Sequence, residues 1–107
     1  MDTQRKKGIL DICVLSVLHN TPSYGYQIIK EVSNCIEISE STLYPILKRL
    51  EKSDCLTTYK QEYNGRIRKY YEITQMGEEK IQAFLSEWEE IKQIYGFVEQ
   101  KIQEKES

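Results

Sequence analysis

The sequence predicts a mainly α-helical protein with a small β-hairpin, arranged as a winged helix-turn-helix followed by a long C-terminal helix. Three patterns support this prediction. Two short amphipathic segments are separated by a brief break, an Asn-Gly pair joins two β-prone runs, and a heptad pattern fills the end of the chain. We expect residues 1–73 to form the winged helix-turn-helix domain and residues 74–107 to form the terminal helix.

The first helix is predicted from Arg5 to His19, where apolar residues recur at helical spacing. Ile12 and Leu15 add apolar surface on a second side, so we expect this helix to be covered on more than one face. A chain of this size has little material for that cover, which favours a partner subunit. Pro22 cannot continue the helix, and Ser23 is placed to cap the next one.

The next two helices are predicted at about residues 23–33 and 41–53, and their short separation is typical of a helix-turn-helix. The apolar residues of the second of them share one face, with polar residues opposite. Pro45 is tolerated only near a helix start, so Ser39 or Ser41 is the expected cap. A helix of this kind enters the DNA major groove with its N-terminal residues at the base edges.

A β-hairpin is predicted from residues 56–63 and 66–73 around Asn64-Gly65, because a type I′ turn needs positive φ at both central positions. An isolated two-stranded hairpin is marginally stable, so it should lean on the helices as a wing. Three cations, Arg66, Arg68 and Lys69, follow the tip directly.

Thr74 is predicted to cap the last helix, whose apolar residues advance in steps of three and four. The helix is too long for the small body to cover, so a second subunit is its expected partner. The predicted dimerisation residues are Ile81, Phe84, Trp88, Ile91, Tyr95 and Val98. Trp88 has two interpretations: filler of a dimer core, or a wall for a flat hydrophobic ligand, with Ile12 and Leu85 as candidate lining residues.

The net charge of −2 argues against nucleic-acid binding, but the charge is unevenly distributed. Residues 1–73 contain 11 Lys and Arg against 9 Asp and Glu, whereas residues 74–107 contain 4 against 8. DNA binding requires a basic face rather than a basic protein. The candidate DNA-contacting residues are Lys6, Lys7, Tyr24, Ser41, Thr42, Tyr44, Lys48, Arg66, Arg68 and Lys69. We therefore expect double-stranded DNA as a partner.

Enzymatic and metal-binding functions find no support in the sequence. It contains no nucleophile elbow, phosphate-binding loop or metalloprotease motif, and its single histidine, His19, is interpreted as a helix-end residue. Cys13, Cys35 and Cys55 lack the spacing of a zinc site or a disulfide framework, which favours buried thiols in a reducing compartment. With no apolar run of about 20 residues, we expect a cytoplasmic protein without cofactors. The alternative function is an adaptor that binds a protein partner through the heptad helix, without DNA.

The motifs resemble those of the PadR family of bacterial transcriptional regulators, specifically its short subfamily with a single C-terminal helix. The matching stretches are residues 24–28, 41–51 and 65–74, followed by Gly77. The resemblance implies a homodimer that represses transcription at an inverted-repeat operator, often upstream of its own gene, and short members commonly control detoxification or efflux genes. Some bind planar aromatic compounds at the dimer interface, around a tryptophan matching Trp88. One residue departs from the pattern, since Ile67 stands where proline is common. The bulky side chain of Phe84 is expected to fill part of any central pore.

Overall fold

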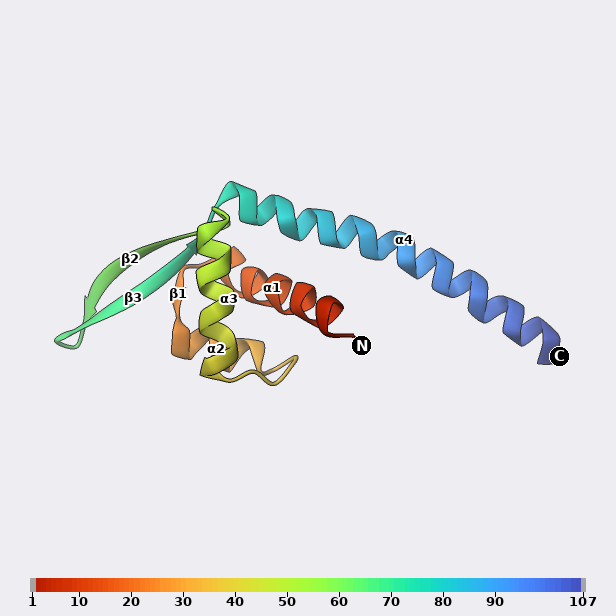
Figure 1. Cartoon of the computed structure of the whole chain (residues 1–107), viewed down its shortest axis with the longest axis horizontal. Helices are drawn as coiled ribbons and strands as arrows, with labels where there is room; N and C mark the ends of the chain where they lie inside the picture. The colour runs from red at the N-terminus through yellow and green to blue at the C-terminus, as the bar shows by residue number, and fades with distance from the viewer. Residues whose placement is uncertain (1, 107) are drawn as a thin grey trace.

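The computed structural model describes residues 2–106 as a small body from which one long helix projects (Figure 1). The elements in chain order are α1 (Thr3–Asn20), β1 (Ser23–Tyr24), α2 (Gly25–Val32), α3 (Glu40–Lys52), β2 (Leu56–Tyr63), β3 (Arg66–Ile73) and α4 (Gln75–Glu106). The extents are 66 × 26 × 23 Å because the hairpin and α4 leave the body in opposite directions (Figure 1). The predicted winged helix-turn-helix with a long terminal helix is confirmed.

The hairpin forms at the predicted residues. Asn64 and Gly65 have φ values of 52° and 79°, so both central positions of the turn adopt the positive φ that a type I′ turn requires. The sheet, however, has three strands in the order β1-β3-β2, all antiparallel, with Ser23 opposite Tyr71 and Tyr24 opposite Tyr70. The prediction that Ser23 caps α2 is therefore wrong: Ser23 lies in a strand, and the N-cap of α2 is Tyr24 without a side-chain hydrogen bond.

The hydrophobic core lies where the three short helices meet the base of the sheet. Its most completely buried side chains are Val14, Leu15, Leu18, Ile28, Leu43, Leu47, Leu50 and Leu56. α1 contacts α2, α3, α4 and β3. The expected cover of α1 on more than one face is confirmed, and much of it comes from this chain, which buries Leu15 completely and leaves Ile12 only 9% exposed.

The start of α4 is held firmly against the body. The backbone N–H of Gly77 donates to Thr74 Oγ1 at 3.1 Å, which confirms the predicted cap, and the Thr74 hydroxyl donates to the Asp54 carbonyl at 2.6 Å. His19 at the end of α1 bonds Glu78 in the first turn of α4, with 2.7 Å between Nδ1 and Oε2. These contacts, together with the burial of Ile81 one turn further on, fix the start of α4 against the body.

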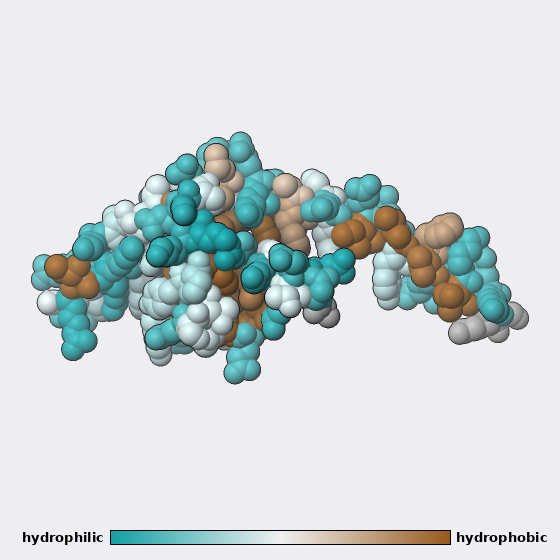
Figure 2. Space-filling model, viewed as in Figure 1, coloured by the Kyte–Doolittle hydropathy of each residue, from teal (hydrophilic) through white to brown (hydrophobic). Residues whose placement is uncertain are grey.

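Beyond this first part, α4 is uncovered. Every residue from Leu85 to Lys105 is exposed, and Figure 2 shows hydrophobic side chains gathered along the projecting helix. In the stretch from residue 2 to residue 106, no helix combines the length and apolar character needed to cross a membrane. The apolar residues on the exposed part of α4 are interspersed with many charged residues.

The three cysteines differ in environment. Cys55 is buried as predicted, Cys13 is partly buried, and all three are free thiols. Cys35 is exposed on the segment that follows α2, so the prediction of a buried thiol is wrong for this residue. The signal for burial was weak there because residues 33–39 form the connection between α2 and α3.

Candidate DNA-binding interface

α3 presents a polar outer face because its apolar residues are buried in the core. Leu43, Leu47 and Leu50 are at most 1% exposed, whereas the predicted DNA-contacting residues Ser41, Thr42, Tyr44 and Lys48 are all exposed. Ser39 is the N-cap, and its hydroxyl lies 3.0 Å from that of Ser41 and 3.3 Å from that of Thr42. Hydroxyl groups therefore cluster at the end of the helix that would meet base edges.

An ion pair between Arg49 and Asp11 fixes α3 to α1. The Asp11 side chain is 10% exposed and that of Arg49 is 48% exposed, so the guanidinium brings its charge to a nearly buried carboxylate from the surface. A buried carboxylate without a cation would be costly. Sequence reasoning missed this pair, because the two residues are 38 positions apart and Asp11 stands in no motif.

Tyr44 connects α3 to the start of α2. A Cβ atom placed on Gly25 would lie 2.3 Å from the Tyr44 hydroxyl oxygen and 3.0 Å from Cζ, so only glycine admits the ring in this position. Tyr44 nevertheless remains 47% exposed. The glycine of the Tyr24-Gly25-Tyr26 stretch thus positions a residue that is predicted to contact DNA.

The three wing cations do not share one face of the hairpin. Arg66 pairs with Tyr63 and Arg68 with Gln61, whereas Lys69 pairs with Lys60, and alternate residues of a strand point to opposite faces. The Lys69 ammonium lies 5.5 Å from the ring centroid of Tyr71, which faces the core. Arg66 and Arg68 are therefore on the outer face, and Lys69 is on the other.

Arg68 is held by aromatic rings. Its guanidinium carbon lies 3.9 Å from the ring centroid of Tyr24 and 4.2 Å from that of Tyr63. Such cation–π contacts stabilise by about 0.5–1 kcal/mol each at exposed sites. The ring of Tyr70 continues the cluster, edge-on to Tyr24 at 5.6 Å and stacked on Tyr59 at 5.4 Å. The base of the wing is consequently stiff, and Arg68 is oriented before any ligand arrives.

A groove joins α3 to the wing. Its volume is about 320 Å³, and its lining residues are Tyr24, Gly25, Tyr26, Tyr44, Ile67, Arg68, Lys69 and Tyr71. A second hollow of about 600 Å³ continues from Tyr24 and Tyr26 to Arg66 near the hairpin tip. Burial raises the pKa of Tyr71, and the nearby Tyr44 and Glu51 raise it further. The structure thus brings Tyr44 together with Arg68 and Lys69 at the groove, while Arg66 joins Tyr24 and Arg68 at the second hollow.

Two of the predicted positions lie elsewhere, and one residue was missed. Lys6 and Lys7 are exposed near the start of α1, which Figure 1 shows on the side of the body away from the hairpin. Tyr26 is 68% exposed and lines both hollows of the interface. Its neighbours in the Tyr24-Gly25-Tyr26 stretch were the signal that could have identified it.

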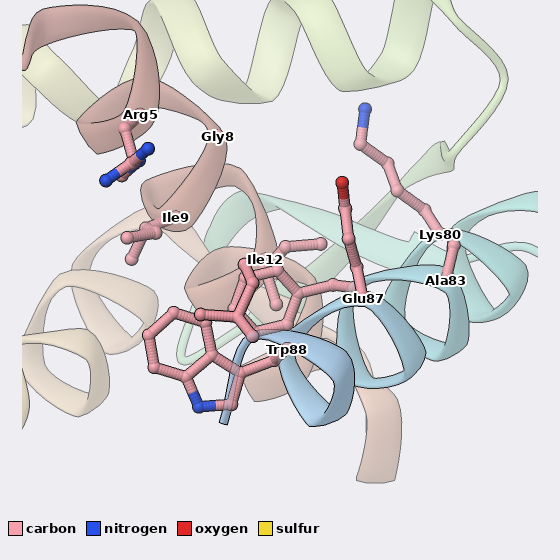
Figure 3. A pocket seen from close by; sticks show the side chains of 10 residues that line it. Arg5, Gly8, Ile9, Ile12, Lys80, Ala83, Glu87 and Trp88 are labelled. Atoms are coloured by element: carbon pink, nitrogen blue, oxygen red, sulfur yellow. The ribbon is translucent and has the colours of Figure 1, made fainter. Parts of the chain in front are cut away.

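A separate hollow of about 410 Å³ lies between α1 and α4 (Figure 3). Ile12 and Trp88, two of the predicted ligand-binding residues, line it together with Phe84. The rings of Phe84 and Trp88 are nearly parallel, with an interplanar angle of 10° and centroids 6.3 Å apart. Leu85, the third predicted residue, instead lines a smaller hollow beside His19. The aromatic hollow is therefore formed without Leu85.

The predicted dimerisation residues fall into two groups. Trp88, Ile91, Tyr95 and Val98 are between 46% and 66% exposed, and Phe84 is half-buried. Ile81 differs, since it is only 9% exposed and packs in the core of its own chain. Little of Ile81 is left to contact a partner, so the exposed seam of α4 begins at Phe84.

Comparison with known proteins gives a consistent result. The model of the Transcriptional regulator PadR-like family matches residues 14–83, from the middle of α1 to the first part of α4. An uncharacterized protein of Lysinibacillus sphaericus is 37% identical over 93 residues, which are 82% of this chain and 85% of that protein.

Two solved structures are similar over most of their length. The crystal structure of smu.1704 from Streptococcus mutans UA159 has 42% sequence identity and a TM-score of 0.77, covering 87% of this chain and 89% of that one. A PadR-like transcription factor from Bacteroides fragilis has 33% identity and a TM-score of 0.80, covering 90% and 95%.

Proposed function

The chain belongs to the PadR-like family of transcriptional regulators, and from this premise we propose that it represses transcription by binding an inverted-repeat operator as a homodimer. The observation that carries the proposal is the groove in which Tyr44 of α3 lies beside Arg68 and Lys69 of the wing. α3 fits the major groove, while the wing reaches the adjoining backbone or minor groove. The protein acts in the cytoplasm, where the operator is found.

Each part of the interface has a defined task in this proposal. Ser41, Thr42 and Tyr44 meet base edges, and Lys48, one turn further along α3, contacts a base or a phosphate. On the wing, Arg66, Arg68 and Lys69 neutralise phosphates. We do not assign Lys6 and Lys7 to this interface, because they lie near the start of α1 on the other side of the body.

Residues 1–73 bind DNA in this scheme, and residues 74–107 join the two subunits. The exposed seam of α4 supports the second part: an amphipathic helix that leaves Trp88, Ile91 and Val98 about half exposed buries them against a second copy. The charge distribution supports the same division, since excess negative charge on α4 keeps the dimerisation helix away from DNA.

We further propose that a planar aromatic compound binds beside Trp88 and relieves repression. The hollow of about 410 Å³ falls in the size range of small-molecule sites, and its walls include Trp88, Phe84 and Ile12. Titration of Trp88 fluorescence with a panel of planar aromatic cations tests this part. Quenching that Phe84→Ala alters would support the site, and emission that no compound changes would exclude it.

The DNA-binding proposal is tested by selecting operators from random duplex DNA and measuring affinity by fluorescence anisotropy. An inverted repeat with half-sites about 34 Å apart is the expected product. Arg66→Ala should weaken binding about tenfold and lower the salt dependence of log Kd by about one unit, as for loss of one phosphate contact. Combining it with Arg68→Ala should abolish binding while leaving the dimer intact, as judged by sedimentation.

Lys92→Ala is the matched control. It removes the same charge from the α4 surface, where Lys92 pairs with Glu89, far from the groove. Its affinity should equal that of the unaltered protein. If Arg66→Ala and Lys92→Ala bind equally well, the wing does not contact DNA. If no duplex is selected at all, the exposed seam of α4 favours the alternative, a protein adaptor.

A further inference from the structure

Two cysteines that take no part in the proposed DNA contacts lie at one cavity. Cys13 of α1 and Cys35, on the segment after α2, both line a hollow of about 360 Å³ whose walls also include Val17, Val32 and Phe84. The backbone N–H of Cys35 donates to the Val32 carbonyl at 2.9 Å, which places the residue directly at the end of α2. The fold therefore brings together two thiols that are 22 residues apart in sequence.

Cys35 also affects the titration of Cys13. The pKa of Cys13 is raised, first by burial and then by Cys35, through charge repulsion and a side-chain hydrogen bond. Cys13 thus stays protonated at neutral pH, whereas Cys35 is exposed to solvent. Cys55 is excluded from this pair: it is 3% exposed and its thiol contacts Ser53 instead.

We propose that Cys13 and Cys35 form an oxidation site at which a hydroperoxide converts the two thiols into an intramolecular disulfide. The exposed Cys35 reacts first, as its thiolate attacks the peroxide. An S–O bond forms, the O–O bond breaks, and an alcohol leaves, or water when the oxidant is hydrogen peroxide. Cys35 is then a sulfenic acid.

Cys13 completes the reaction from the cavity side. Its sulfur attacks the Cys35 sulfur, the S–S bond forms, and the S–O bond breaks. The hydroxyl group leaves as water with the proton of the Cys13 thiol. In total the two thiols lose two electrons and two protons, and the hydroperoxide is reduced to an alcohol and water. The roles follow from the environments, since the exposed Cys35 meets the oxidant and the partly buried Cys13, which loses its proton as it attacks, lines the same hollow.

The disulfide would join α1 to the segment that leads into α3. Residues 33–39 connect α2 to α3, so a bond at Cys35 restrains the entry to the helix that carries Ser41 and Tyr44. Formation of the bond depends only on the thiols and not on DNA binding, so it is measured without DNA.

The experiment treats the full-length protein with hydrogen peroxide, alkylates the remaining thiols and maps the peptides by mass spectrometry. The expected product is a peptide pair linked through Cys13 and Cys35, two hydrogen masses lighter, with Cys55 alkylated and with full reversal by dithiothreitol. Cys55→Ser should leave the product unchanged. Cys13→Ser should accumulate a Cys35 sulfenic acid that dimedone traps, and Cys35→Ser should slow thiol oxidation by peroxide at least tenfold.

Several outcomes would overturn the proposal. One is a Cys35–Cys35 link between two chains on a non-reducing gel. Another is a Cys35 sulfinic acid in a chain whose Cys13 is still free. A third is the absence of a linked peptide, with thiol oxidation no faster than that of free cysteine. Circular dichroism melting shows whether each serine variant is folded. Cys13→Ala serves as the second variant where serine disturbs the partly buried position, and it should trap the same Cys35 sulfenic acid.

Discussion

Gly77→Ala should destabilise the protein by about 2 kcal/mol. A Cβ at this position would lie 2.5 Å from the Cys55 carbonyl oxygen and 2.6 Å from Cγ1 of Ile73. The carbonyl cannot retreat freely, because it accepts the backbone N–H of Thr74 at 3.1 Å. Overpacking costs about 1–3 kcal/mol and a disturbed hydrogen bond about 1 kcal/mol, whereas the helix propensity of alanine returns about 1 kcal/mol.

Thermal unfolding followed by circular dichroism measures this effect at a fixed protein concentration. For a chain of this size, about 2 kcal/mol lowers Tm by about 10 °C. Gly96→Ala in the same helix is the matched control, since nothing lies within 4 Å of its Cβ position in this chain. It should raise stability by about 0.5–1 kcal/mol. A Gly77→Ala protein that melts with the unaltered protein would refute the close packing at the start of α4.

Three further substitutions test the contacts that shape the interface. Gly25→Ala should displace only the end of the Tyr44 side chain, so stability changes by less than about 1 kcal/mol while operator affinity, measured by anisotropy, falls about tenfold. Arg49→Met should lower the free energy of unfolding in urea by about 2 kcal/mol. The effect is smaller than for a fully buried pair because this guanidinium is half exposed, and adding Asp11→Asn to the same chain should recover part of the loss. Gly65→Ala should cost about 1 kcal/mol because its φ is 79°, and an unchanged urea midpoint would contradict the strained turn.

The parts of the fold that depend on neighbouring residues were predictable from the sequence. The hairpin formed at the predicted positions because Asn64 and Gly65 readily adopt the positive φ that the turn requires, which is a property of these two residues alone. β1 was missed because a two-residue strand shows no periodicity, and its partners Tyr70 and Tyr71 lie far along the chain. Helix ends were predictable only to within about two residues, as is usual for capping signals.

The assembled site depends on contacts that no local pattern contains. The register of the hairpin predicts which residues share a face. The contact of Arg68 with the ring of Tyr24 could not be predicted, because it depends on where β1 packs. The heptad pattern placed Ile81 in the exposed seam with Phe84, because spacing alone does not show which turns of the helix pack against the rest of the chain. In the structure Ile81 is buried in the core. Leu85, the residue after Phe84, lines the hollow beside His19 and not the hollow that contains Trp88, which the spacing also could not show.

Because α4 is long and is held at its base, a small rotation there would move its far end much further. From Glu78 to Ile102 the helix rises about 36 Å at 1.5 Å per residue, so a rotation of about 10° at its base displaces the far end by about 6 Å. In a dimer joined along α4, the same geometry works in reverse: a small tilt between the paired helices changes the distance between the two wings. Half-sites on DNA are one helical turn, about 34 Å, apart, so a shift of this size puts the two subunits out of step with the double helix. If the protein binds DNA as the proposed dimer, the close packing at Gly77 and the bond between His19 and Glu78 would help to set the spacing between the two wings.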